Sequence, residues 1–214
     1  MPPSRKIEIH PATADRWADL AALFGQRGAC AGCWCMWPRL QAAEFKRGAG
    51  DSNRRALQRL VRVGERPGLL AYAGGEAVGW IALGPRADYP RLEKSRVLAP
   101  VDDQPVWSVT CFFIRRDWRG QGLATRLLKE AAKFAAANGA RILEGYPTEA
   151  SKRAADAFVW TGIASTFERA GFSEVARRSA SRPIMRKTLR PRAKAPRRAA
   201  AAVKQPTAKP ARKA

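Results

Sequence analysis

The sequence predicts a domain of the mixed α/β class, because strand and helix periodicities both run through it. Residues 6–10 alternate polar and apolar side chains, as a half-buried strand does. Residues 123–135 carry apolar side chains at the three- and four-residue spacing of an amphipathic helix. Two apolar runs flank the pair Gly74-Gly75, which can supply the positive φ angles of a tight hairpin turn.

The other elements follow from the same criteria. The first predicted strand ends at Pro11. Thr13 can then cap a predicted helix that continues to about Phe24. A second helix is predicted over 51–63 with Asp51 as its cap. Residues 84–105 show no sustained period, and a connection of this length in a compact domain is usually functional. The remaining predicted elements are a hairpin over 68–83, a central strand over 106–114, a helix closed by Asn138-Gly139, a strand over 141–146, a helix over 157–169, and paired strands over 172–176 and 183–189.

Positive charge is concentrated at the C-terminal end. The net charge is +22, and residues 186–214 hold eleven Lys or Arg and no acid, which leaves +11 for the rest. Residues 190–214 consist mainly of Ala, Pro, Lys and Arg and have almost nothing large to bury, so we expect a disordered basic tail after a domain over 1–189. We expect such a tail to bind nucleic acid weakly and without base readout, and a solubilising or incidental extension is an equal alternative.

No stretch of the sequence suits a membrane span or a secretory signal, so we expect a cytoplasmic protein without membrane attachment. Cytosolic cysteines are expected to be reduced. Three of the four, Cys30, Cys33 and Cys35, fall within six residues. Their spacing is cramped for zinc, which prefers two Cys-x-x-Cys pairs, so we expect packing and no metal.

A turn with two glycines, Gly120 and Gly122, separates the central strand from the following helix. A helix N-terminus presents unpaired N–H groups, and glycine lets a phosphate approach the backbone closely. Arg119 adds a positive charge beside it. This motif lacks the Lys-Ser/Thr of a Walker loop and the third glycine of a Rossmann turn, so by itself it indicates an anion site only.

The turn Arg119-Gly120-Gln121-Gly122-Leu123-Ala124 resembles the Arg/Gln-x-x-Gly-x-Gly/Ala signature of the GNAT acetyltransferases. Residues 75–81, 112–118 and 166–172 resemble further family segments in the same order, so the likeness extends over about residues 6–188. It implies a mostly antiparallel mixed sheet with splayed fourth and fifth strands, helices on both faces, and acetyl-CoA as co-substrate. The acetyl-CoA-binding residues that it implies are Phe112, Phe113, Ile114, Arg119, Gly120, Gln121, Gly122, Leu123, Ala124 and Thr125.

The resemblance also implies transfer of an acetyl group to a primary amine, but one family residue is missing. Many members carry a tyrosine as general acid where this chain has Phe167. Tyr146, at the end of the predicted fifth strand, and Glu144, two residues before it, are the candidate catalytic residues. Carboxylates of the long loop, such as Glu93 and Asp102, remain alternatives as a base.

The candidate acceptor-binding residues are Trp34 and Trp37, where the family builds its acceptor pocket, and Arg86 and Arg91 of the long loop. Core packing is an equal alternative for the two tryptophans. A globule of charge +11 repels polyamines, so we expect a neutral or anionic acceptor. A monomer and a homodimer both agree with the sequence.

Two other functions remain open. One is a GNAT-like domain that senses acetyl-CoA without catalysis, which the replacement at Phe167 favours. The other is a nucleic-acid-associated protein whose tail does the binding.

Overall fold

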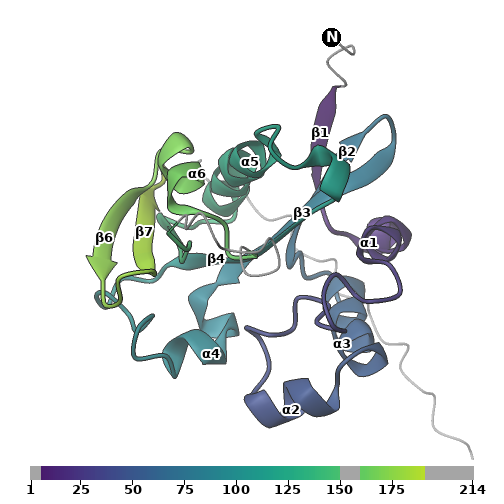
Figure 1. The fold of residues 1–214 in the computed structure, drawn as a ribbon, viewed down its shortest axis with the longest axis horizontal. Coiled ribbons are helices and arrows are strands. Elements are labelled where there is room, and N and C mark those ends of the chain that lie inside the picture. Colours follow the sequence, from purple (N-terminus) through teal and green to yellow (C-terminus); the bar gives the residue numbers. More distant parts are fainter. Residues whose placement is uncertain (1–5, 150–159, 191–214) are drawn as a thin grey trace, which may run out of the picture.

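The structure, a computed structural model, describes residues 6–149 and 160–190 of the chain. Within these ranges, seven strands form one sheet in the order β1-β2-β3-β4-β5-β7-β6, with helices against both faces (Figure 1). This confirms the mixed α/β class. The strands are β1 (Ile7–Pro11), β2 (Gly68–Ala73), β3 (Glu76–Pro85), β4 (Trp107–Ile114), β5 (Ile142–Gly145), β6 (Ser173–Arg177) and β7 (Pro183–Thr188). The helices are α1 (Trp17–Phe24), α2 (Ala42–Arg47), α3 (Asp51–Arg62), α4 (Pro90–Glu93), α5 (Leu123–Ala137) and α6 (Ala164–Arg169), with short 3-10 helices at Ala14–Arg16, Arg86–Asp88 and Arg116–Trp118.

Neighbouring residues of the central strands pack on opposite faces of the sheet. In β3, Ile81 joins the buried cluster formed with α5 and α6, whereas Trp80 joins the cluster formed with α1 and α3. Phe112 and Cys111 of β4 divide between the two clusters in the same way. Because successive side chains of a strand point to opposite faces, both faces are covered, as the continuous apolar run at 106–114 predicts.

The β4 and β5 strands are parallel and pair over only three residues. Trp107–Val109 of β4 pairs with Leu143–Gly145 of β5, after which the two strands diverge. Beyond this point, the backbone N–H of Phe112 donates to the carbonyl oxygen of Trp160 at 2.6 Å, and Thr148 forms a parallel bridge with Ile163. The predicted splay of these strands is therefore present, and residues 160–163 lie between them.

Glycines with positive φ angles close two of the predicted turns. Gly74 and Gly75, with φ of 59° and 84°, form the turn between β2 and β3. Gly139, with φ of 89°, follows the C-terminal end of α5. Both were expected from the sequence, because glycine adopts this backbone region without steric cost.

Helix starts differ from the prediction in three places. Gly50, with φ of 87°, is the N-cap of α3, and Asp51 is its first helical residue. Thr13 precedes a 3-10 turn, and its hydroxyl accepts from Arg16 rather than capping backbone N–H groups. The last helix, predicted from residue 157, begins at Ala164 in the structure, because residues 160–163 contact β4 and Thr148 instead of forming helical turns. Residues 157–159 of the predicted helix lie outside the described ranges.

The segment 84–105 has more structure than its sequence indicates. Its first two residues extend β3, and a 3-10 turn and α4 follow. Its later part is tied to the turn between β6 and β7, since Arg178 donates to the carbonyl oxygens of Ala99 at 2.6 Å and Pro100 at 2.9 Å. It is therefore an ordered wall beside the sheet.

None of the helices that the structure describes is long and apolar enough to cross a membrane. The basic tail predicted over 190–214 lies outside the described residues from 191 onward, so the structure does not address its predicted disorder or its binding to nucleic acid.

Candidate active site

The turn between β4 and α5 leaves the start of α5 open. Gly122 is the N-cap of α5 in the left-handed region, with φ of 77° and ψ of 6°, and no side chain caps the helix. Gly120 also has a positive φ, of 71°. A Cβ atom built on either glycine meets no described atom within 4 Å. The first N–H groups of a 15-residue helix therefore face open space, which suits an anion.

Two polar side chains of this turn form hydrogen bonds to the backbone of the preceding residues. Arg119 donates through Nε to the carbonyl oxygen of Ile114 at 3.0 Å, and Gln121 donates to the carbonyl of Asp117 at 2.7 Å. Leu123 is buried, so only its backbone can contribute to binding. The predicted cofactor residues 119–125 thus form one local arrangement, in which backbone amides are the groups left for a ligand.

The β4 backbone beside the splay is already engaged at one point. The resemblance assigns Phe112, Phe113 and Ile114 to the pantetheine arm, but the N–H of Phe112 is bonded to Trp160. Gly162 allows this close approach, because a Cβ there would lie 3.1 Å from the Phe112 ring. Sequence reasoning missed Trp160, whose only signal is the nearby glycine.

A cavity of about 440 Å³ opens beside this backbone. Its wall combines the loop before α2, the α4 region, β4, the end of β5 and the turn between β6 and β7. The side chains that line it include those of Trp37, Arg91, Thr110, Tyr146, Trp160 and Arg182. This volume falls in the range of small-molecule sites.

Two of the four predicted acceptor residues line this cavity. Trp37 is 39% exposed, and the guanidinium of Arg91 lies 3.5 Å from the centre of its ring. Trp34 is buried instead and stacks on Trp17 at 6.0 Å, so packing is its role. Arg86 is also buried and lies behind the cavity wall. Trp34 and Arg86 therefore do not line this cavity, and their predicted contacts with the acceptor stay predictions.

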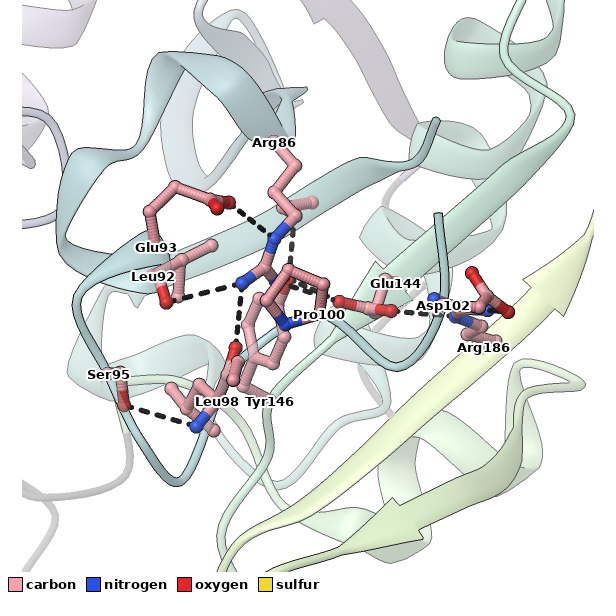
Figure 2. A network of polar contacts seen from close by, with 12 residues as sticks. Arg86, Leu92, Glu93, Ser95, Leu98, Pro100, Asp102, Glu144, Tyr146 and Arg186 are labelled. Atoms are coloured by element: carbon pink, nitrogen blue, oxygen red, sulfur yellow. Dashed lines mark hydrogen bonds and ion pairs between the residues drawn. The ribbon is translucent and has the colours of Figure 1, made fainter. Parts of the chain in front are cut away.

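A buried network of charged and polar side chains, shown in Figure 2, reaches the cavity wall at Tyr146. Both oxygens of Glu144 are used: Oε1 accepts from Arg86 at 3.1 Å and from the Tyr146 hydroxyl at 2.6 Å, and Oε2 accepts from Arg186 at 2.7 Å. Asp102, the loop carboxylate weighed as a base, accepts from Arg186 at 2.6 Å. The network joins the long loop to β5 and β7.

The Tyr146 hydroxyl has no free hydrogen-bonding position. It donates to Glu144, accepts from Arg86 at 2.7 Å, and lies 2.8 Å from the Ser108 hydroxyl. Burial, followed by the Glu144 charge, raises the pKa of Tyr146 well above its ordinary value, so it stays protonated at neutral pH. Glu144 and Tyr146, the two candidate catalytic residues, contact each other in a closed and fully paired network.

Arg86 organises the long loop around this network. Its Nε donates to Glu93 at 2.7 Å, and its Nη2 donates to the carbonyl oxygens of Leu92 at 3.2 Å and Leu98 at 2.7 Å. The Arg86 guanidinium therefore holds the loop at Leu92, next to Arg91, and at Leu98 in the cavity wall. Glu93, the other loop carboxylate weighed as a base, is engaged in this bracing.

Among the described residues, no group of three or more metal-binding side chains occurs. Cys35 and Cys111 are buried, and their sulfur atoms lie 3.3 Å apart as a thiol pair. Trp34 and Cys35 have positive φ angles of 46° and 49°, a conformation that non-glycine residues seldom adopt. This segment packs tightly against α1 through Trp34.

Thiol labelling checks this arrangement. Burial raises the pKa of Cys33 to about 11, so only about one Cys33 thiol in 1,000 is ionised at pH 8. Cys30 is exposed, and Cys35 is buried. Iodoacetamide at pH 8, followed by peptide mass analysis, should label Cys30 alone in the native protein and all cysteines in denaturant. Equal labelling rates at Cys30 and Cys33 would contradict this packing.

The chain matches the family model of the acetyltransferase (GNAT) family over residues 30–159. No curated protein matches it significantly. Among solved structures, it is similar to a GNAT-family acetyltransferase from Listeria monocytogenes 4b F2365, with a TM-score of 0.54 and 11% identity over 87% of this chain and 97% of that chain. A GNAT-family acetyltransferase from Streptococcus agalactiae 2603 gives 0.52 and 11% over 85% and 95%. An N-acetyltransferase from Staphylococcus aureus Mu50 gives 0.50 and 12% over 86% and 98%.

Identities this low show a shared fold alone, whereas the family match covers more than half of the chain and includes the turn before α5. The chain therefore belongs to the GNAT acetyltransferase family.

Proposed function

We propose that this protein is an N-acetyltransferase that moves the acetyl group of acetyl-CoA directly to a primary amine of a small molecule or protein. The observation that carries the proposal is the start of α5, where Gly120 and Gly122 leave open space in front of uncapped amides. A diphosphate suits this arrangement, because the helix dipole and the N–H groups both favour negative charge.

The chain contributes binding on two sides of the reacting centre. The first amides of α5 hold the diphosphate, and the β4 backbone orients the pantetheine arm. A pantetheine carbonyl that binds the N–H of Phe112 takes the place of the Trp160 carbonyl. One hydrogen bond replaces another, so the exchange itself costs little net free energy. The acceptor occupies the cavity beside β4.

The acceptor must lose a proton before it can attack. An alkyl ammonium with a pKa near 10.4 is neutral only about once in 2,500 molecules at pH 7, a cost of roughly 4.6 kcal/mol. Arg91 and Arg182 line the cavity, and nearby positive charge favours the neutral amine. The site thus lowers the cost of deprotonation even though Glu144 is fully paired.

The thiolate leaving group does not depend on a tyrosine at position 167. Phe167 is fully buried and packs edge-on against Phe112 and Phe172. A Cβ on Gly145 would lie 2.1 Å from the Phe167 ring, so this glycine makes room for it. A thiol with a pKa of about 8.5 is a tolerable leaving group, and we propose that solvent protonates it.

A second candidate is an acetyl-CoA sensor without catalysis. Two observations favour it: Phe167 cannot donate a proton, and the Tyr146 hydroxyl is fully engaged. Both candidates require acetyl-CoA binding, and they differ in whether turnover occurs.

The test measures binding and turnover on the full chain. Calorimetry should detect acetyl-CoA binding, and thiol release should depend on both enzyme and amine across a panel of primary amines. Mass spectrometry of the amine should show one added acetyl group for each thiol released. Binding without acceptor-dependent release on any amine would support the sensor. Absence of binding would reject both candidates.

A further inference from the structure

Two arginines of the cavity wall have only neutral partners among the described residues. Arg91 donates through Nε to the carbonyl oxygen of Leu40 at 2.9 Å, and it stacks on the Trp37 ring. Arg182 donates to the hydroxyl of Thr161 at 2.9 Å and to one backbone carbonyl at 3.4 Å. Their charges are therefore not balanced by any acid in these parts of the chain.

Three other arginines near the site, whose side chains are little exposed, are paired with acids. Arg39 lies 3.3 Å from Asp88, and Arg86 and Arg186 share Glu144 at 3.1 Å and 2.7 Å. Each of these three guanidinium groups is thus neutralised, as the cost of burying a charge requires. The two cavity arginines depart from this pattern.

The unbalanced charges are partly removed from water. Burial lowers the pKa of both Arg91 and Arg182. The Nη2 atom of Arg91 is buried and has no hydrogen-bond partner within residues 6–149 and 160–190. Arginine remains charged at any physiological pH, so it cannot escape this cost by losing its proton. An anionic ligand in the cavity would supply the missing negative charge.

We propose that the acceptor is an amine that also carries a carboxylate, and that Arg182 and Arg91 bind this carboxylate; this rests on the proposed acetyltransferase function. A guanidinium matches a carboxylate with two parallel hydrogen bonds. The described lining of the cavity contains hydroxyls, such as those of Ser95 and Ser179, but no Asp or Glu. Polyamines and lysine-rich peptides would meet two positive charges without compensation.

The wild-type test compares amino acids with the corresponding amino-acid amides, and it includes spermidine and phosphoethanolamine. The amides keep the primary amine and carry a neutral amide in place of the carboxylate. We expect kcat/KM to be about 100-fold higher for the amino acids, since hydrogen bonds to charged groups are the strong ones. Preference for the amides or for spermidine would overturn the proposal. Preference for phosphoethanolamine would overturn the carboxylate assignment.

The variant test uses Arg182→Gln, with Arg169→Gln as the control. Arg169 lies on the exposed surface of α6, so its replacement removes the same charge away from the cavity. Arg182→Gln should remove most of the 100-fold preference, because kcat/KM should fall far more for the amino acids than for the amides, whereas Arg169→Gln should leave the preference unchanged. Equal losses with amino acids and amides in Arg182→Gln would overturn the proposal.

Stability separates a ligand-binding arginine from a structural one. Because Arg182 has no acidic partner among the described residues, Arg182→Gln should leave the Tm unchanged or raise it. A fall of several degrees would assign a structural role and overturn the proposal. The proposed function fails separately, through absence of acetyl-CoA binding by calorimetry. If acetyl-CoA binds without turnover, calorimetry with the amino acids and their amides decides the carboxylate preference.

Discussion

Replacement of Glu144 by alanine should lower the free energy of unfolding by about 3–5 kcal/mol. Glu144 is fully buried and is the shared partner of Arg86 and Arg186. Its removal leaves two guanidinium groups without that partner in a region of low dielectric, and it leaves the Tyr146 hydroxyl without its acceptor. Urea denaturation of the full chain measures the loss as a shift of the midpoint.

The matched control is Glu130→Ala, which removes a glutamate from the surface of α5. Glu130 pairs with Lys133 at 2.6 Å, but both side chains are exposed. Such pairs contribute less than about 1 kcal/mol, so the control should barely move the midpoint. Equal effects of the two substitutions would show that the network around Glu144 contributes no more than a surface pair.

The pH–rate profile of the Glu144→Gln variant then distinguishes a structural role of Glu144 from a role as catalytic base. The glutamine keeps the shape but presents an amide N–H₂ to one of the arginines, so stability should fall. If Glu144 acts as a support, activity per folded molecule should fall without loss of an ionisation from the pH–rate profile. Disappearance of one limb of that profile would instead identify Glu144 as a base.

The elements that the sequence predicts well are those with local signals. The turn at Gly74-Gly75 and the central apolar strand carry their information in contiguous residues. The start of α6 does not, because the extended conformation of Ile163 follows from its bridge to Thr148. The short helix α2 was not predicted at all, since six residues are too few for a helical period to be recognised.

In the candidate site too, groups that are close in the sequence were predictable, and groups that only the fold brings together were not. The uncapped turn before α5, which we propose as the diphosphate site, was predictable because neighbouring residues form it. The contact between Glu144 in β5 and Tyr146 just after it fits their spacing of two residues, which places side chains of an extended backbone on the same side. Their partner Arg186 lies 42 residues from Glu144, and no local pattern could have paired them. Arg182 was missed for the same reason: only the folded chain places it in the cavity with Arg91.

Replacement of Gly122 by glutamate should weaken acetyl-CoA binding by at least about 100-fold, equivalent to the loss of roughly two charge-assisted hydrogen bonds. The new side chain would project into the open space before α5, where no described atom lies within 4 Å of a Cβ. Its carboxylate would also compete for the amides that we assign to the diphosphate. Calorimetry with acetyl-CoA gives the dissociation constant.

The matched control is Gly139→Glu at the other end of the same helix. Gly139 also has a positive φ, of 89°, and open space around a built Cβ, so it shares the backbone strain of Gly122 at 77°. Forcing a side chain into this conformation costs roughly 1–2 kcal/mol, and both variants should lose stability to a similar extent. Only Gly122→Glu should lose acetyl-CoA. Unchanged affinity in that variant would place the diphosphate elsewhere, whereas equal losses in both would trace the effect to strain in α5 rather than to its first amides.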